Sequence, residues 1–161
     1  AFDPYQSGNL LDYIELTQDR DEIFRTGDYV SIHVPATEQT INSVGRREFS
    51  MMKKTAFLIN TARGSIVDEP ELIRALEEKQ IAGAALDVLH DEPFQKDNPL
   101  LGMDNVLTAP HIGAATKEAS GRASLTCAEN IDDFFCGRPL RSVVPELRDL
   151  ISPIIKGKEK K

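Results

Sequence analysis

The stretch Thr55-Ala-Phe-Leu-Ile-Asn60, followed directly by Thr61-Ala-Arg-Gly64, decides the fold of this chain. It is a short apolar run that stops abruptly at polar residues and a glycine. Three similar runs occur at residues 28–34, 81–88 and 105–109, and the first and last of these are stopped by a proline. Near-continuous apolar runs of this length are typical of strands that are buried on both faces of a sheet.

Helical patterns alternate with these runs. Asp19 can cap a short helix that ends at Gly27, and residues 46–53 are amphipathic. Asp68 can cap a third helix with acidic residues in its first turn, and a longer helix is expected over residues 117–135. The alternation predicts an α/β fold, a doubly wound parallel sheet with helices on both faces. Ligands of such sheets lie beyond the carboxyl ends of the strands.

Composition narrows the possible functions. The 161 residues suit one domain, and the formal net charge is −7, although the last six residues hold four lysines and one glutamate. So acidic a chain repels phosphate backbones, which disfavours nucleic-acid binding. It lacks the apolar run of about 18 residues that a membrane span needs. It also has no visible secretory signal and no metal-ligand spacing, so we expect a cytoplasmic protein without a structural metal.

Three polar groups follow successive strands and therefore belong to one edge of the predicted sheet. Arg63 follows the second strand, Glu92 the third and His111 the fourth. Taken singly, each has an ordinary interpretation: a surface arginine, a polar loop before a proline turn, and a structural histidine. Taken together, they can hold a carboxylate and exchange a proton beside a hydride carrier. We expect them to meet at a shared mouth and to serve the reduction of a 2-keto acid.

The motifs around these residues resemble the D-isomer-specific 2-hydroxyacid dehydrogenases. The resemblance covers almost all of residues 1–145, in the family's order and spacing. Its segments are residues 3–5 (DPY), 33–35 (HVP), 58–64 (LINTARG), 83–88 (GAALDV), 92–93 (EP) and 110–116 (PHIGAAT).

The resemblance implies an NAD-dependent enzyme and assigns roles to individual residues. His111 would be the proton donor to the keto oxygen, Glu92 its partner and Arg63 the anchor of the substrate carboxylate. Asp87 would bind the nicotinamide carboxamide. The remaining cofactor residues would be Val34 and Pro35 near the adenosine, and Thr61, Ala62, Arg63, His111, Gly113 and Ala114 around the nicotinamide.

Asp3 carries a separate argument about the cofactor. An acidic residue at the end of the second strand of a Rossmann sheet binds the adenosine ribose hydroxyls and repels a 2′-phosphate. That position favours NAD over NADP. The alternative is that Asp3 only closes a turn with Pro4.

The sequence departs from the family at its beginning. Asp3 should follow a glycine-rich phosphate loop by about 20 residues, yet only two residues precede it. We therefore expect an incomplete Rossmann-type sheet, without its first strand, its glycine-rich loop and the substrate domain. Expected divisions are residues 1–137 for the cofactor domain, 138–155 for a return segment toward the substrate domain, and 156–161 for a disordered basic tail. Such a piece should bind NAD weakly and be inactive alone.

The function predicted for the parent protein is an oxidoreductase acting on a D-2-hydroxy acid or 2-keto acid. The stretch 111–119 most resembles phosphoglycerate dehydrogenases, with glyoxylate or hydroxypyruvate as the next candidate substrates. The family resemblance also implies a homodimer, to which residues 117–135 could contribute. An alternative is a non-catalytic NAD-sensing module that acts as a corepressor through dimerisation.

Overall fold

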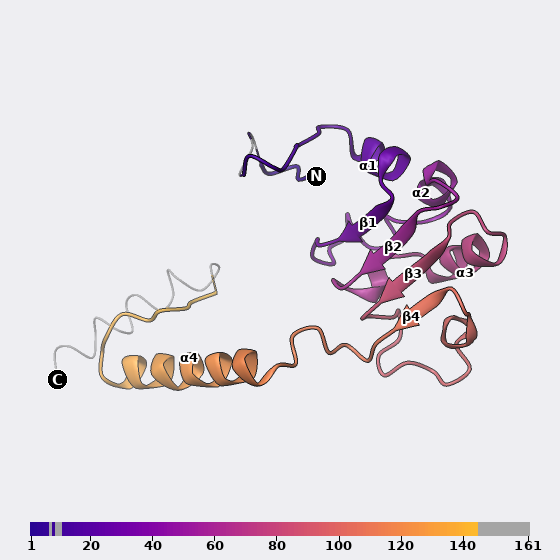
Figure 1. Cartoon of the computed structure of the whole chain (residues 1–161). Coiled ribbons are helices and arrows are strands. Elements are labelled where there is room, and N and C mark those ends of the chain that lie inside the picture. The colour runs from indigo at the N-terminus through magenta and orange to yellow at the C-terminus, as the bar shows by residue number, and fades with distance from the viewer. Residues whose placement is uncertain (7, 9–10, 145–161) are drawn as a thin grey trace. The chain divides into compact units, whose positions relative to one another are not determined.

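The computed structural model describes residues 1–6, 8 and 11–144. The chain forms two compact units, of residues 1–113 and from Ala114 onward (Figure 1). The expected division after residue 137 stays a prediction. Residues 145–161, which include most of the predicted return segment and all of the basic tail, lie outside the described residues.

The first unit is built on a four-stranded parallel sheet in the order β1-β2-β3-β4. All four expected strands are present, as β1 (Tyr29–Ile32), β2 (Phe57–Asn60), β3 (Gly83–Leu86) and β4 (Val106–Thr108). The register aligns Ile32 with Asn60 and Asn60 with Leu86, so the carboxyl ends of neighbouring strands lie level. The predicted α/β class with a parallel sheet is confirmed.

Two of the three helices of this unit begin directly after the residues that the sequence marks as caps. Their bounds are α1 (Arg20–Thr26), α2 (Arg46–Met51) and α3 (Glu69–Glu77), with short 3₁₀ turns η1 (Gly64–Ile66) and η2 (Pro99–Gly102). Asp19 accepts a hydrogen bond from the backbone N–H of Asp21, and Asp68 accepts one from that of Glu71. These carboxylates satisfy N–H groups that have no partner inside the helix.

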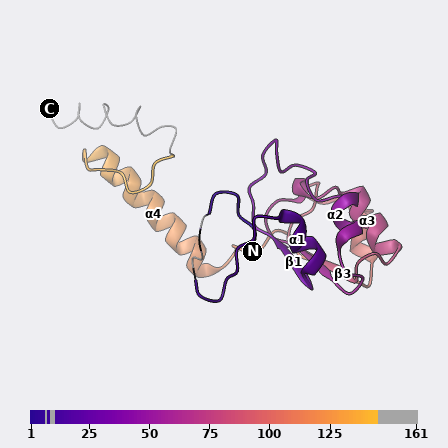
Figure 2. The ribbon, with the colours of Figure 1, turned by 90° about the horizontal axis from the view of Figure 1, so that it is seen from above.

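All three helices of the first unit pack on one face of the sheet, so the prediction of helices on both faces is wrong for this unit as far as it is described. Phe24 of α1, Phe49 of α2 and Leu72 of α3 belong to one buried cluster with Val30 and Leu58 of the strands. The helices lie in a row, α1 beside α2 and α2 beside α3 (Figure 2). Right-handed crossovers between strands that follow each other in one direction place their helices on the same side.

The opposite face of the sheet is apolar and exposed. Tyr29 and Phe57 stack with 5.7 Å between ring centroids, and they are 70% and 38% exposed. Leu107 on β4 is 72% exposed. An apolar face of this kind is unusual for a sheet of this class, whose faces are both normally covered.

The second unit, as far as it is described, is α4 (Lys117–Phe135) and the segment after it. Thr116 caps the helix by accepting a hydrogen bond from Ala119 N–H. Asp133, which is buried, binds both Arg138 and Arg141. The chain after α4 is thereby held against the last turns of the helix.

Candidate active site

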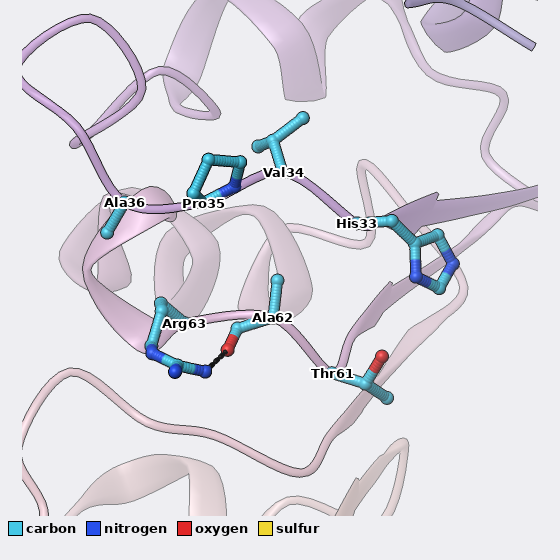
Figure 3. Close-up of a pocket in the computed structure, with 7 residues that line it drawn as sticks. All are labelled: His33, Val34, Pro35, Ala36, Thr61, Ala62 and Arg63. Carbon is cyan, nitrogen blue, oxygen red and sulfur yellow. Dashed lines mark hydrogen bonds between the residues drawn. The ribbon is translucent and has the colours of Figure 1, made fainter. Parts of the chain in front are cut away.

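A cleft opens at the carboxyl ends of β1 and β2 (Figure 3). We call it the first cleft; its volume is about 440 Å³. Its lining comes from the two loops that follow these strands, namely His33, Val34, Pro35, Ala36, Thr61, Ala62 and Arg63. Most of these side chains are short, so a flat ring can lie against the backbone there.

Asn60 organises the second of these loops. Its side chain is 1% exposed, its Nδ2 donates to the Arg63 carbonyl at 2.9 Å, and its Oδ1 accepts from Ala62 N–H at 3.0 Å. A buried amide that is satisfied at both ends fixes the loop firmly. Sequence reasoning did not single out Asn60; the signal was a polar residue closing an otherwise apolar strand.

Arg63 lies in the first cleft with an exposed side chain. Its Nη1 donates to the carbonyl of its neighbour Ala62 at 2.6 Å (Figure 3). One guanidinium nitrogen is therefore used locally, while the rest of the fork of donors is available to an anion. The structure thus places Arg63 beside the predicted cofactor residues Val34, Pro35, Thr61 and Ala62.

A second cleft of about 200 Å³ lies beyond β3 and β4. It contains the pair His111 and Glu92, in which His111 Nδ1 and Glu92 Oε2 are 2.7 Å apart. Both side chains are partly exposed, 44% and 40% respectively. The apolar part of the lining comes from Leu89, Pro93, Phe94, Ala109 and Pro110. The structure therefore brings together two of the three predicted catalytic side chains.

Asp87 holds the turn that carries His111. The Asp87 carbonyl accepts from His111 N–H at 2.8 Å, and its two carboxylate oxygens accept from Ile112 N–H at 2.8 Å and Gly113 N–H at 2.9 Å. The hydrogen bonds from Ile112 N–H, which has the largest effect, and from Gly113 N–H lower the pKa of the Asp87 carboxyl group. His111 itself has a φ of 54°, in the left-handed region that residues other than glycine rarely adopt without support from their surroundings.

Gly113 fits this arrangement because a side chain at this position would collide with the Asp87 carboxylate, which clamps the histidine turn by its hydrogen bonds. A Cβ atom on Gly113 would stand 2.8 Å from Asp87 Oδ2. Both predicted cofactor residues Asp87 and Gly113 are thus involved in shaping the histidine turn. Contact of Asp87 with a nicotinamide carboxamide stays a prediction.

The loops of the two clefts touch at Gly64. A Cβ atom on Gly64 would lie 1.8 Å from the Leu89 carbonyl oxygen and 2.6 Å from His90 N. Only a residue without a side chain permits this approach of two backbones. The turn that bears Arg63 is therefore packed directly against the segment that leads to Glu92.

We expect Gly64→Ala to destabilise the protein strongly, because the added methyl group meets backbone that cannot rotate away. The free energy of unfolding should fall by about 3 kcal/mol, the upper end of the usual cost of overpacking, measured by urea denaturation. Gly102→Ala is the matched control, since a Cβ atom on Gly102 meets nothing within 4 Å. Equal stabilities of the two variants would contradict this packing.

Asp3 and Ala114 are placed differently from the other predicted residues. Asp3 Oδ1 accepts from Tyr5 N–H at 2.9 Å, which is the turn given above as the alternative to ribose binding. Phe2 pairs with Thr17 in an isolated parallel bridge. Ala114 begins the second unit. The cofactor roles of both residues stay predictions.

The fold and these clefts define a class of protein. A parallel sheet with a shallow cleft at its carboxyl edge is the architecture that binds nucleotide cofactors. A histidine paired with a glutamate at the same edge of the sheet is an arrangement suited to acid–base chemistry. Together they are the features of a nucleotide-binding domain that carries a candidate acid–base pair. Among the described residues, no helix is long and apolar enough to cross a membrane.

Comparison with known proteins identifies the family. Residues 1–113 match the D-isomer specific 2-hydroxyacid dehydrogenase, NAD binding domain family, and the chain belongs to it. The chain is 41% identical over 146 residues to a D-3-phosphoglycerate dehydrogenase of Methanocaldococcus jannaschii, covering 89% of this chain and 28% of that protein. It is 49% identical over 113 residues to a glyoxylate reductase of Thermofilum pendens, covering 70% and 33%.

A solved structure agrees with this assignment. The D-isomer specific 2-hydroxyacid dehydrogenase of Lactobacillus delbrueckii ssp. bulgaricus, solved with NAD, matches with a TM-score of 0.82 at 31% identity, covering 89% of this chain and 47% of that one. The predicted family and its NAD cofactor are confirmed. The chain spans about a third of the length of the two curated relatives, so it corresponds to part of such a protein.

Proposed function

We propose that the protein containing this chain is an NAD-dependent oxidoreductase that interconverts a D-2-hydroxy acid and the 2-keto acid. The observation that carries the proposal is the His111–Glu92 pair, at 2.7 Å, on a turn held by Asp87 at the same carboxyl edge of the sheet as the first cleft. Bound NAD supplies the hydride acceptor, and its reduced form the donor. The chain's own residues then have to hold the substrate and move one proton.

His111 and Glu92 provide the proton transfer in this proposal. Because Nδ1 of His111 faces Glu92, Nε2 is the ring nitrogen that exchanges a proton with the substrate oxygen. During reduction of the keto acid, protonated His111 donates that proton as the oxygen gains charge. The Glu92 carboxylate holds the ring in one orientation and stabilises its cationic form.

Arg63 would anchor the substrate carboxylate. It follows β2, the neighbour of β3, and its turn packs through Gly64 on the segment leading to Glu92. A guanidinium fork matches a carboxylate in geometry as well as charge. The carbonyl of a 2-keto acid is one bond away from its carboxylate, so binding of the carboxylate by Arg63 would bring the carbonyl to the edge of the sheet that also carries His111.

We expect Arg63→Ala to act mainly on substrate binding. Loss of a charge-assisted hydrogen bond should raise KM for the keto acid by about 10- to 100-fold. The affinity for NAD, measured by fluorescence titration, should change far less. Arg63→Lys should recover only part of the loss, since an ammonium cannot bind a carboxylate in a bidentate manner. An unchanged KM in the alanine variant would remove Arg63 from this role.

Two aspects of specificity belong to the same proposal. Asp3 would bind the adenosine ribose, which favours NAD over NADP. For the substrate, phosphohydroxypyruvate is the first candidate and glyoxylate or hydroxypyruvate the next, in line with the names of the two curated relatives. The homodimer and the cytoplasmic location inferred from the sequence stay predictions.

The test is a panel of 2-keto acids with the full-length protein. We expect oxidation of NADH with at least one of the three acids named above, and slower oxidation of NADPH. An inactive protein that dimerises on adding NAD would instead support the sensing module. The family, the two curated relatives and the solved structure are all named as dehydrogenases or reductases, which favours the enzyme.

A further inference from the structure

One carboxylate outside both clefts binds the two ends of the loop that carries Glu92. We call residues 90–98 the Glu92 loop. Glu69 Oε2 accepts from the His90 backbone N–H at 2.9 Å, and Glu69 Oε1 accepts from Asn98 Nδ2 at 2.8 Å. Each oxygen of the carboxylate thus binds one end of the loop.

These two bonds are not needed to form α3. Glu69 is the first residue of that helix, and the capping bond at its start comes from Asp68. Glu69 is half-buried. A half-buried carboxylate that reaches across to another loop, 21 and 29 residues along the chain, orders that loop rather than its own helix.

The Glu92 loop has little regular structure of its own between the two bonds. Its far end is fixed by Asn98, whose Oδ1 accepts from Leu100 N–H at 2.9 Å and so caps η2. Between the ends lie Glu92, which binds His111, and Pro93 and Phe94, which line the second cleft. The orientation of Glu92 therefore depends on where the loop ends are held.

The segment that bears Glu69 also bears Arg63. It starts at the Arg63 turn, runs through η1 and enters α3 at Glu69. At Gly64 it packs on the Leu89 carbonyl, and at Glu69 it binds the next residue, His90. The same short segment thus contacts two successive residues of the chain that leads into the Glu92 loop.

We propose that Glu69 is a positioning residue that keeps Glu92 within hydrogen-bond distance of His111. It does so by pinning both ends of the Glu92 loop to the start of α3, and it contacts neither cleft. The inference rests on the proposed function, because Glu92 matters as the partner of His111. Glu69 sets how well that pair is aligned, while the cofactor cleft at β1 and β2 is built from other loops.

The hydrogen bonds allow a test by exchange of donor and acceptor. In Glu69→Gln, the amide keeps one acceptor and sets an NH₂ group against one of the two donors, so one loop end is released. In Asn98→Asp, a second carboxylate faces Glu69 and the bond between them is lost. In the double variant, the glutamine donates to the aspartate and accepts from His90 N–H, so every bond is restored. An aspartate also keeps the cap on Leu100 N–H.

We expect each single variant to lower kcat for keto-acid reduction by about 10- to 100-fold, as misplacement of a catalytic pair does. The double variant should return to within about threefold of the wild type, because the two substitutions are coupled. The affinity for NAD should stay unchanged in all three. Glu71→Gln removes an acidic group from the same helical turn, where it pairs with Arg74, and should leave kcat unchanged.

The outcomes separate the positioning role from stability and from the proposed function. A kcat that follows the unfolding midpoint across the variants, or a double variant as slow as the singles, would overturn the positioning role. If the wild type reduces no 2-keto acid, the proposed function fails by itself. Hydrogen exchange at the His90 amide then decides the role of Glu69 through Glu69→Ala, which removes both acceptors: faster exchange than in the wild type supports it, and unchanged exchange overturns it.

Discussion

Replacing His111 by glutamine should reduce the rate of keto-acid reduction by about 10²- to 10⁴-fold, the usual contribution of a positioned acid or base. A glutamine amide can still hydrogen-bond to Glu92, but it cannot donate a proton to a developing alkoxide. The affinity for NAD should be retained, because the first cleft is lined by the loops after β1 and β2. Single-turnover kinetics and a fluorescence titration measure the two quantities separately.

A second variant tests whether the loss of rate comes from disruption of the turn rather than from loss of the imidazole. His111 has a φ of 54°, and asparagine tolerates this region better than glutamine does. His111→Asn should therefore keep the turn and lose the rate to the same extent. Glu92→Gln keeps the hydrogen bond to the ring but removes the charge, so its loss should be smaller. Full activity in His111→Asn would show that another group carries the proton.

The strands and helix starts were predictable because their causes are local. Helix α4 covers the predicted residues 117–135, and the caps at Asp19 and Asp68 make the expected bonds. The apolar runs are longer than the strands they contain. Ile81 and Val88 flank β3 and are fully buried, but they lie outside the ladder of paired residues. Residues next to a strand can therefore be buried without being paired in the sheet. The apolar pattern in the sequence indicates which residues are buried, so it is longer than the strand.

The candidate site was predictable only in part, because its geometry is set by contacts distant in sequence. Strand order alone brought Glu92 and His111 to one edge, and the structure pairs them. It could not reveal that Glu69 binds the ends of the Glu92 loop, since such a glutamate looks like ordinary acid in a first helical turn. Nor did strand order reveal that both carboxylate oxygens of Asp87 accept hydrogen bonds from the turn that carries His111.

Asp87→Asn should lower kcat by about 100-fold, because the turn that carries His111 loses its clamp. The carboxylate accepts from two successive N–H groups, whereas an amide offers one acceptor and turns an NH₂ group toward the other donor. His111 would then relax from its left-handed backbone conformation, and its ring would leave Glu92. The measurement is kcat, together with hydrogen exchange at Ile112 and Gly113.

The same clamp predicts a dependence on pH. Hydrogen bonds from Ile112 N–H and then Gly113 N–H, with a smaller effect of the His111 charge, hold the pKa of Asp87 below its ordinary value. A carboxyl group whose folded pKa is lowered stabilises the fold above its unfolded pKa of about 3.9, and that contribution is lost as the pH falls through the folded value. Protection of the Ile112 and Gly113 amides should therefore hold at neutral pH and weaken in acid.

Asp87→Asn should abolish this acid-dependent loss, because an amide does not titrate. The exposed Asp104, at the turn before β4, supplies the control: Asp104→Asn removes the same charge and should leave both kcat and the acid dependence of Ile112 and Gly113 unchanged. If Asp87→Asn instead kept slow exchange at these two amides and lost affinity for NAD alone, then Asp87 would act on the nicotinamide carboxamide and not on the histidine turn.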